Sequence, residues 1–417
     1  MTGTSLEPLA RRVREASRVL AQAPTAVRND ALRMAADLLE AEWESLVVAN
    51  RSDLAAAESA GMVPSSLDRL RLDEDRVRAM ASGLRNVAGL DDPLGEVVAG
   101  WVRPNGLRVS QVRVPLGVVG VIYENRPNVT SDVAGLCLKS GNAAFLRGSG
   151  SALVSNQAVV GILRRAAAKA GLPEDAVALV EDISHETAVE FMQLRGLIDC
   201  LIPRGGKALI ASMLEHATVP YVLDGDGNCH IYVDGAADPA MALEIVLNAK
   251  TQRPGVCNAA ETVLVSEAEA ETVVPLLYGA LVQAGVEVRG DEQVRRLVPG
   301  VVAAEESDWG TEYLGPIVAM GVVDGVDGAI EHITRYSSGH SEAIVTGDLR
   351  VADRFVAEVD AAAVLVNAST RFIDGEQLGL GAEVGISTQK LHARGPMGLR
   401  QLTTLKWVVR GDGHVRP

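Results

Sequence analysis

The sequence GVVGVIY, residues 117–123, decides the fold class. It is a short, continuously apolar run, which is typical of a strand buried on both faces of a parallel sheet. Downstream of it, apolar runs alternate with helical patterns. The expected strands are 143–147, 176–180, 198–203 and 221–223, and the expected helices are 132–139, 151–170, 185–193 and 207–215. This alternation predicts a doubly wound parallel sheet with helices on both faces.

A second alternating block lies further along the chain. Its expected strands are 261–265, 316–323, 343–345 and 362–366, and its expected helices are 269–284, 327–336 and 352–359. The stretch 248–258 between the blocks contains Pro254 and Gly255 ahead of Cys257. We expect two α/β domains that join at this stretch, and small-molecule sites commonly lie between domains.

The residues before the first block read as helices. Apolar residues recur there at three- and four-residue spacing, which predicts helices over 6–21, 26–60 and 75–87. Two other segments, 107–114 and 402–410, are rich in β-branched residues and flanked by Gly or Pro. We interpret these two segments as strands that pair in a small sheet and carry a subunit contact.

The composition indicates an ordinary globular protein. Of the 417 residues, 47% are hydrophobic and 22% are charged, and the formal net charge is −15. The sequence lacks the basic stripe that is usual in nucleic-acid-binding proteins. No apolar run reaches the roughly 18–20 residues that cross a bilayer, and the amphipathic residues 1–18 lack the apolar centre of a signal peptide. We therefore expect a cytoplasmic protein with a small-molecule substrate and no membrane or nucleic-acid partner.

The cysteines and histidines do not follow a metal-binding pattern. The four cysteines are widely spaced and contain no C-x-x-C pair, which also argues against a disulfide scaffold. Three histidines are tempting acids or bases but lack ligand spacing, and we expect them to be hydrogen-bonded structural residues: His230, His332 and His340. We expect no bound metal.

The segment TQRPGVCNAAETVLV, residues 251–265, contains the cysteine with the most distinctive neighbours. Gly255, two residues before Cys257, allows a tight turn. A turn of this kind exposes backbone N–H groups, which can lower a thiol pKa from its usual value of about 8.5 and bind an oxyanion. By residue types alone, Cys257 is equally compatible with a buried loop residue and with a nucleophile.

An ordered set of motifs around Cys257 resembles the aldehyde dehydrogenase superfamily. The arrangement G-x-C ahead of a strand resembles the nucleophile segment. The other motifs resemble the loop of the oxyanion asparagine, the turn at the adenosine ribose, the turn facing the nicotinamide mononucleotide and pyrophosphate, and the segment whose glutamate holds the nicotinamide ribose. In that order they are ENRPNVT (124–130), LRGSGS (146–151), PRGGK (203–207) and EYLGPI (312–317).

Longer strings are similar to one member family, the γ-glutamyl phosphate reductases. These strings are QRPGVCNAAET (252–262), RPNVT (126–130), AIEHITRYSSGHSEAI (329–344), NASTRF (367–372) and LGLGAEVGISTQKLHARGP (378–396). The resemblance covers essentially the whole chain. It implies an α/β, aldehyde dehydrogenase-like fold of two doubly wound parallel-sheet domains plus a small β oligomerisation element. The implied domains are 1–106 with 116–247 for the cofactor, 248–390 for catalysis, and 107–115 with 391–417 for oligomerisation.

The resemblance also assigns catalytic and substrate-binding residues. Cys257 would be the nucleophile and Asn128 the oxyanion side chain, with Asn125 as the alternative because a small alignment shift exchanges the two. Bidentate arginines suit the phosphate and carboxylate of the implied substrate. The arginines in matching strings are Arg126, Arg253, Arg371 and Arg394.

The cofactor assignment rests on the resemblance, because the chain contains no G-x-G-x-x-G. The residues that it assigns to the cofactor are Arg147, Gly148, Ser149, Gly205, Gly206, Glu312, Gly315 and Pro316. A turn between a strand and a helix N-terminus favours anions. Because Arg147 and Ser149 lie in such a turn and could bind a 2′-phosphate, we expect NADPH rather than NADH.

The implied reaction reduces L-glutamyl 5-phosphate with NADPH to L-glutamate 5-semialdehyde and phosphate, through a Cys257 thioester, in proline biosynthesis. Hydrolytic aldehyde dehydrogenases activate water with a glutamate in E-L-G-G-[KS]. The corresponding stretch here, VLDGDGNCH (222–230), contains Asp224 and Asp226 but no glutamate. A reaction that releases phosphate needs no activated water, so this departure favours the reductase.

Two alternatives remain open at this stage. One is a coenzyme A-linked acylating aldehyde dehydrogenase, and the other is a non-catalytic scaffold of the same fold. The chain contains no kinase block, so a glutamate kinase that supplies the acyl phosphate would be a separate polypeptide. The two strand segments suggest a homo-oligomer, at least a dimer.

Overall fold

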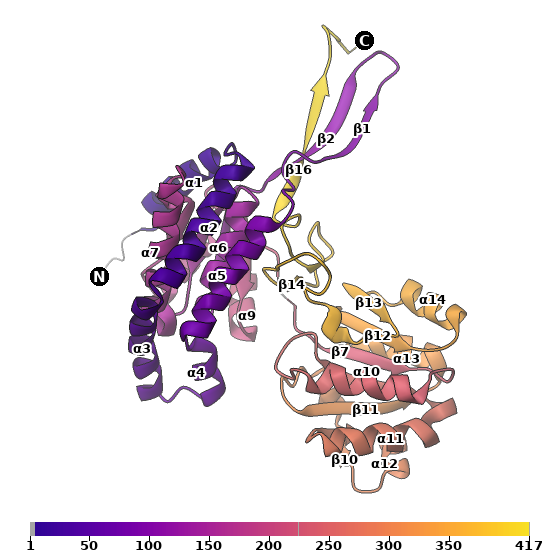
Figure 1. Cartoon of the computed structure of the whole chain (residues 1–417). Helices are drawn as coiled ribbons and strands as arrows, with labels where there is room; N and C mark the ends of the chain where they lie inside the picture. Colours follow the sequence, from indigo (N-terminus) through magenta and orange to yellow (C-terminus); the bar gives the residue numbers. More distant parts are fainter. Residues whose placement is uncertain (1–4, 224, 417) are drawn as a thin grey trace. The chain divides into compact units, whose positions relative to one another are not determined.

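The computed structural model describes residues 5–223 and 225–416, which form two compact units. Unit 1 comprises Met1–Leu223, Leu380–Gly385 and Met397–Pro417, and unit 2 comprises Asp224–Gly379 and Ile386–Pro396. In Figure 1, helices α1 to α9 belong to unit 1 and helices α10 to α14 belong to unit 2. Both units are α/β, as the alternation of strands and helices predicts.

The sheet of unit 1 is built around GVVGVIY. β3 (Val118–Tyr123) is buried along its whole length, which confirms the expected strand. It pairs in parallel with β4 (Ala143–Arg147) on one side and with β6 (Cys200–Arg204) on the other, and β5 (Val177–Leu179) follows β4. Of the expected strand 221–223, Tyr221 makes an isolated bridge to Leu201.

The helices of unit 1 pack on this sheet and on one another (Figure 1). They are α1 (Glu7–Leu20), α2 (Thr25–Ala41), α3 (Trp43–Ser59), α4 (Pro64–Leu70), α5 (Glu74–Gly89), α6 (Pro127–Lys139), α7 (Leu153–Lys169), α8 (His185–Met192) and α9 (Lys207–His216). The expected helix 26–60 is divided at Glu42, whose φ of −110° and ψ of 16° are not helical. The break lets α2 pack mainly against α5 and α3 mainly against α7.

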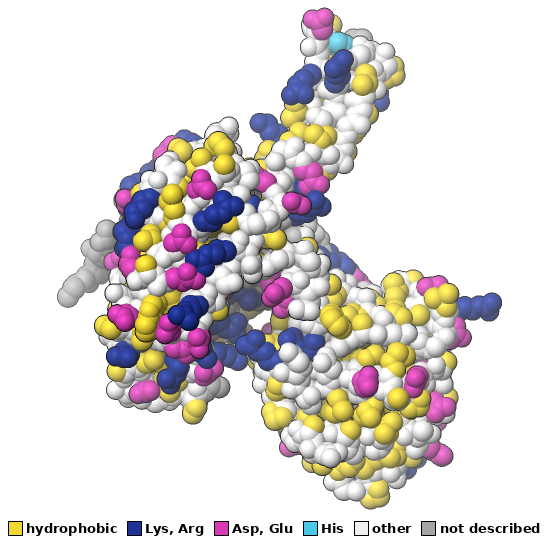
Figure 2. Space-filling model, viewed as in Figure 1, with side chains coloured by type: hydrophobic (Ala, Val, Ile, Leu, Met, Phe, Trp, Pro, Cys, Tyr) yellow, Lys and Arg dark blue, Asp and Glu magenta, His cyan; other side chains and the backbone are white. Residues whose placement is uncertain are grey.

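The surface of unit 1 mixes charges of both signs. Figure 2 shows acidic and basic side chains interspersed over its helices. Arg85 of α5, for example, forms ion pairs with Glu40 and Asp37 of α2. Because acidic and basic side chains are interspersed, no long patch of a single charge sign forms among the described residues on this face.

The two strand segments outside the alternation pair with each other, as expected. β2 (Arg108–Pro115) and β16 (Thr403–Arg410) are antiparallel, with Thr403 opposite Pro115 and Arg410 opposite Arg108. β1 (Val97–Val102) adds a further strand on the other side of β2. We call β1, β2 and β16 the projecting sheet, because they extend from the helical body of unit 1 (Figure 1).

Unit 2 contains a larger parallel sheet. Its strands, in spatial order, are β10 (Val302–Ala303), β9 (Glu287–Gly290), β11 (Ile317–Val323), β8 (Ala260–Ser266), β7 (Cys229–Val233), β12 (Ser341–Val345) and β13 (Ala363–Val366). Val263 and Val265 pack in the core that also contains residues of α10 (Pro239–Thr251), α11 (Ala270–Gln283) and α12 (Glu292–Leu297). Leu264 points to the opposite face and packs with α13 (Gly325–Tyr336) and α14 (Leu349–Glu358). This alternation covers both faces of the sheet.

The boundaries between the two units differ from the predicted domain boundaries. The predicted boundary at 247/248 lies inside unit 2, because β7 pairs in parallel with β8 and β12 and α10 packs beside α11. The predicted oligomerisation segment 391–417 is also divided. β15 (Gly395–Pro396) pairs with β14 (Ile386–Ser387) within unit 2, whereas Met397–Pro417 belongs to unit 1.

Candidate active site

Cys257 lies in the loop of unit 2 that joins α10 to β8, and it is partly exposed. The three other cysteines are buried: Cys137, Cys200 and Cys229. Burial raises the pKa of each of these three thiols above its usual value. They therefore stay protonated at neutral pH, and Cys257 is the cysteine that solvent and a substrate can reach.

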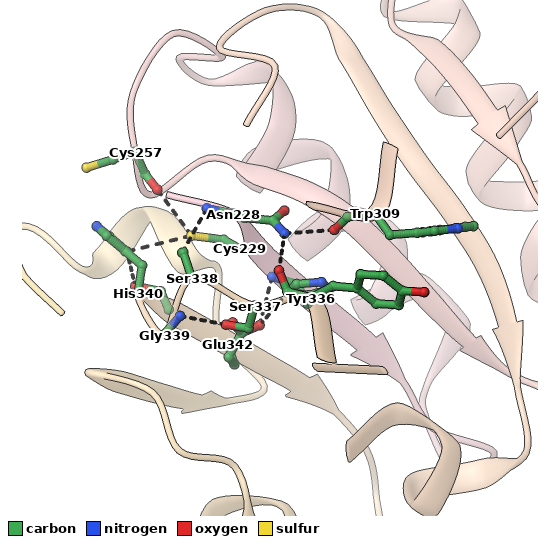
Figure 3. Close-up of polar contacts among 12 residues, drawn as sticks. Asn228, Cys229, Cys257, Trp309, Tyr336, Ser337, Ser338, Gly339, His340 and Glu342 are labelled. Atoms are coloured by element: carbon green, nitrogen blue, oxygen red, sulfur yellow. Dashed lines mark hydrogen bonds and ion pairs between the residues drawn. The ribbon is translucent and has the colours of Figure 1, made fainter. Parts of the chain in front are cut away.

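The segment that leads into β7 holds the backbone of Cys257 in place. The Cys229 thiol donates a hydrogen bond of 3.1 Å to the Cys257 carbonyl oxygen. Gly227 lies against the same carbonyl so closely that a Cβ at this position would overlap it. Figure 3 shows the Cys257 side chain pointing away from the polar network around Cys229. The packing fixes the loop, and the thiol points away from that network.

Glu312 contacts the same segment before β7. Its Oε1 accepts a hydrogen bond of 2.8 Å from the Gly227 N–H. Gly315 and Pro316 lie directly before β11, and Leu314, between Glu312 and Gly315, has a positive φ of 52°. Glu312 and Cys257, which the motifs associate with cofactor and nucleophile, are therefore separated by Gly227 in this structure.

The network beneath Cys257 is made of buried polar side chains (Figure 3). Asn228 donates to the carbonyl oxygens of Trp309 and Tyr336, each at 2.8 Å. Glu342 accepts from the backbone N–H of His230 and contacts its Nδ1 at 3.0 Å. Burial lowers the pKa of His332 to about 3 and that of His340 to about 4, so both imidazoles are neutral at neutral pH. His230 and His340 are hydrogen-bonded through Nδ1, as expected, whereas the buried Nε2 of His332 has no hydrogen-bond partner among the described residues.

Two of the four candidate substrate arginines lie near Cys257 in unit 2. Arg371 donates from Nε to the side chain of Gln252 at 2.8 Å. Burial lowers the pKa of Arg371, Asp374 and Cys257 oppose that shift, and Arg253 adds to it. These charge interactions place Arg371 and Arg253 within electrostatic range of one another, and Arg371 within range of the thiol.

The two other arginines have different surroundings. Arg394 forms an ion pair of 2.7 Å with Asp360. Arg126 lies in unit 1, where it precedes the first turn of α6. The structure therefore divides the set of four arginines that the motifs group together.

The Arg147–Ser149 turn of unit 1 joins β4 to the short 3₁₀ turn that leads into α7. Arg147 donates to the carbonyl oxygens of Ile183 at 3.1 Å and Ser184 at 2.9 Å. Its Nε is buried and makes no hydrogen bond to the described residues. A Cβ at Gly148 would overlap the Asn156 amide nitrogen, which is also buried without a partner among those residues. Gly148 thus lets the Asn156 side chain approach the turn closely, which a residue with a Cβ would prevent.

The glycine turn between β6 and α9 contacts an acidic residue that the motifs did not assign. Gly206 donates its N–H to Glu124 at 3.3 Å, and a Cβ at Gly205 would press on the same carboxylate. Glu124 begins the loop after β3, so it connects that loop to the glycine turn. A signal for this contact was present in the sequence, since Glu124 opens the ENRPNVT string.

The two asparagines of this loop have different surroundings. Asn128 is exposed in the first turn of α6, which begins at Pro127 rather than at residue 132, and it donates to Asp132 at 3.0 Å. Asn125 has a positive φ of 40°, and its side-chain oxygen accepts from the hydroxyls of Ser149 and Ser151. Asn125 is therefore tied to the Arg147–Ser149 turn, whereas Asn128 is tied to its own helix.

Comparisons with known proteins agree with this architecture. Residues 2–299 match the model of the aldehyde dehydrogenase family. A γ-glutamyl phosphate reductase from Moorella thermoacetica is 54% identical over 97% of both chains, and one from Caldanaerobacter subterraneus subsp. tengcongensis is 52% identical over 99% of both. The crystal structure of a γ-glutamyl phosphate reductase from Thermotoga maritima superposes with a TM-score of 0.97 at 50% identity, covering 99% of this chain and 100% of that one.

The chain therefore belongs to the aldehyde dehydrogenase family, and the predicted fold class is confirmed. Within that family it groups with the γ-glutamyl phosphate reductases, which are similar to it over nearly its whole length. Among the described residues, no helix combines the length and the apolar character that a membrane span requires.

Proposed function

We propose that the protein reduces L-glutamyl 5-phosphate to L-glutamate 5-semialdehyde and phosphate, with NADPH as cofactor, in proline biosynthesis. The observation that carries the proposal is the placement of Cys257, the partly exposed thiol, beside Glu312 through their common contact with Gly227. The full-length similarity to γ-glutamyl phosphate reductases supports the choice of substrate.

The chemistry of the chain begins at Cys257. Its thiolate attacks the acyl carbon of the substrate, the bond from that carbon to the phosphate oxygen breaks, and phosphate leaves with the electron pair. The product on the enzyme is a thioester, so one difficult step is divided into two easier ones. We propose that Arg253 and Arg371 favour the thiolate and neutralise the departing phosphate, and that Arg126 and Arg394 bind the remainder of the substrate.

An asparagine of the loop after β3 completes this chemistry by donating to the oxyanion. The motif alignment names Asn128. The hydrogen bonds favour Asn125, because its side-chain oxygen accepts two hydroxyls and its NH₂ group is then directed to other acceptors.

The residues of both units fit a nicotinamide cofactor. In unit 1, the buried nitrogens of Arg147 and Asn156 that have no partner among the described residues suit a bound polar group. We propose that Arg147, Gly148 and Ser149 hold the ribose with its 2′-phosphate, that Gly205 and Gly206 face the pyrophosphate, and that Glu312, Gly315 and Pro316 hold the nicotinamide ribose. When bound, the nicotinamide supplies the hydride that the acyl carbon requires.

The segment VLDGDGNCH supports phosphate release over hydrolysis, since it contains no glutamate to activate water. Asp224 lies outside the described residues. Asp226 is followed by Gly227, whose contacts with Glu312 and Cys257 are structural. The segment thus serves to position the two functional residues.

The deciding experiment is the reverse reaction, oxidation of glutamate semialdehyde, with phosphate or with coenzyme A as acyl acceptor. We expect reduction of the cofactor that depends on phosphate and is much slower with NAD than with NADP. Oxidation that needs coenzyme A would show an acylating dehydrogenase instead. No change in NADP(H) with an intact Cys257 thiol would indicate a scaffold.

The projecting sheet supports a proposed homo-oligomer. Trp101, Leu405, Trp407 and Val409 are each between 42% and 56% exposed, and the rings of Trp101 and Trp407 meet edge to face at 5.7 Å. Figure 2 shows hydrophobic side chains beside Lys and Arg side chains along this sheet. Exposed apolar faces of this kind usually mark interaction sites. We propose a second copy as the partner, a separate glutamate kinase as the source of substrate, and the cytoplasm as the location.

A further inference from the structure

Lys250 and Glu261 form a buried ion pair at the base of the Cys257 loop. Lys250 lies in the last turn of α10 and Glu261 lies near the start of β8, so the loop with the nucleophile runs from one to the other. The distance from Nζ to Oε2 is 2.5 Å, and both side chains are 0% exposed. Removing two charges from water is unfavourable enough that such a pair is weak evidence for stability alone. Stability alone therefore does not account for the Lys250–Glu261 pair.

The second oxygen of Glu261 holds a different segment. Its Oε1 accepts a hydrogen bond of 3.3 Å from the backbone N–H of Leu314. The φ of Leu314 is +52°, a conformation that residues with a Cβ rarely adopt. The Lys250 ammonium also lies 5.9 Å from the ring centre of the neighbouring Tyr313. The buried pair therefore fixes the segment that begins with Glu312.

These contacts connect the Lys250–Glu261 pair, Glu312 and Cys257 in one network. Glu312 accepts from the Gly227 N–H, and Gly227 lies against the Cys257 carbonyl. Cys257 in turn lies in the loop that Lys250 and Glu261 close. The links are hydrogen bonds, an ion pair, a packing contact and the covalent chain from Lys250 to Glu261, all within unit 2.

We propose that Lys250 and Glu261 are positioning residues, which set the place of Glu312 relative to Cys257 by holding Leu314 in its left-handed conformation. This inference rests on the proposed function, in which Glu312 holds the nicotinamide ribose and Cys257 carries the acyl group. Without the acceptor on Glu261, the backbone at Leu314 returns to a common conformation and Glu312 moves with it.

The lysine has a defined part in this arrangement. Burial raises the pKa of Glu261 to about 7, and the Lys250 ammonium opposes that shift. The ammonium thereby favours the ionised form of Glu261, and an ionised carboxylate accepts with both oxygens. One oxygen is then available to Lys250 and the other to Leu314.

The experiment compares two double variants of the full chain. Lys250→Met with Glu261→Gln removes both charges but keeps an amide oxygen for the Leu314 N–H. Lys250→Met with Glu261→Met also removes that acceptor. Neither variant leaves a single buried charge. NADPH dissociation constants from fluorescence titration and the rate of Cys257 alkylation by iodoacetamide are measured for both.

We expect the Gln variant to bind NADPH within about twofold of the parent, and the Met variant to bind it about tenfold more weakly, the loss typical of one hydrogen bond. Both should alkylate at the parental rate, because neither change touches the thiol. Equal NADPH affinity in the two variants would overturn the positioning role.

A second pair of variants avoids the buried charges. Leu314 is 46% exposed, so substitutions there are tolerated by the fold. Leu314→Val, which resists positive φ, should weaken NADPH binding, whereas Leu314→Gly should not. Equal affinities in these two variants also count against the inference.

Glu312→Gln separates this inference from the proposed function. If it weakens NADPH binding while both matched pairs behave alike, the positioning role fails and the proposed function stands. If Glu312→Gln binds NADPH like the parent, the cofactor role of Glu312 fails, and the positioning role fails with it.

Discussion

Single residues near Cys257 differ in what they do for the thiol. Cys229 and Gly227 hold its carbonyl, while the thiol itself faces away from the buried network (Figure 3). Arg371, whose pKa burial lowers, is coupled electrostatically to it. We therefore expect reactivity at this position to depend on a fixed backbone and on positive charge, and each of the two can be removed separately.

Cys257→Ser tests the nucleophile. We expect phosphate-dependent turnover to fall about a thousandfold or more, because a serine hydroxyl is a far weaker nucleophile at neutral pH. NADPH binding, measured by fluorescence titration, should survive. Cys200→Ala is the matched control, since it removes a buried thiol of unit 1 and should leave turnover intact. Full activity of Cys257→Ser would refute the thioester route.

The buried histidines predict how stability depends on pH. Burial, followed by the charges of His230 and Arg335, lowers the pKa of His332 from 6.5 to about 3. The unfolded chain therefore binds a proton below pH 6.5 that the folded chain does not, so stability is complete above pH 6.5 and falls as the pH drops. For one such group the loss is about 2 kcal/mol between pH 6.5 and 5.

The measurement is urea unfolding of the parent and of His332→Phe at pH 7.5 and pH 5. The phenyl ring keeps the contacts with Trp309 and Tyr336 but does not titrate. We expect the variant to lose about 2 kcal/mol less than the parent over this interval. Identical losses would show that His332 does not carry the effect.

Among the elements, α6 decides how the two asparagines are placed. Because the helix begins at Pro127, Asn128 lies within it and Asn125 lies before it. Proline favours the first turn of a helix, and this signal, present in RPNVT, would have moved the predicted start from 132. The periodicity of apolar residues, by contrast, becomes clear only from residue 132 onward.

Substitution of the two asparagines distinguishes them. We expect Asn125→Ala to lower kcat about a hundredfold, the usual effect of losing one oxyanion donor. Asn128→Ala should change kcat little, because it removes an exposed hydrogen bond to Asp132. The reverse order of effects in steady-state kinetics would restore Asn128 as the oxyanion residue.

Local sequence patterns predicted single strands better than they predicted which strands pair with one another. β3, β4, β8 and β11 follow from short apolar runs, and the pairing of β2 with β16 follows from composition. The place of β7 depends on its neighbours β8 and β12, which lie later in the chain. The burial of the Lys250–Glu261 pair arises from the packing of the unit. Cys257 and Glu312 were found through long motif strings rather than through their own spacing.

At the scale of the whole molecule, the apolar face of the projecting sheet predicts self-association. Trp407→Glu places a charge on that face and should shift the mass measured by light scattering toward the monomer. Thr404→Glu is the control, because residues 404 and 407 point to opposite faces of β16. Unchanged mass for Trp407→Glu with intact folding would place the subunit contact elsewhere.

The pairing of β16 with β2 also sets an order of events during synthesis. Residues 403–410 leave the ribosome long after β1 and β2, with all of unit 2 made between them. Until then the β2 edge has open hydrogen-bonding groups, which can pair with another nascent chain. Translation of the last strand therefore closes that edge, and a stalled or truncated chain exposes it to aggregation.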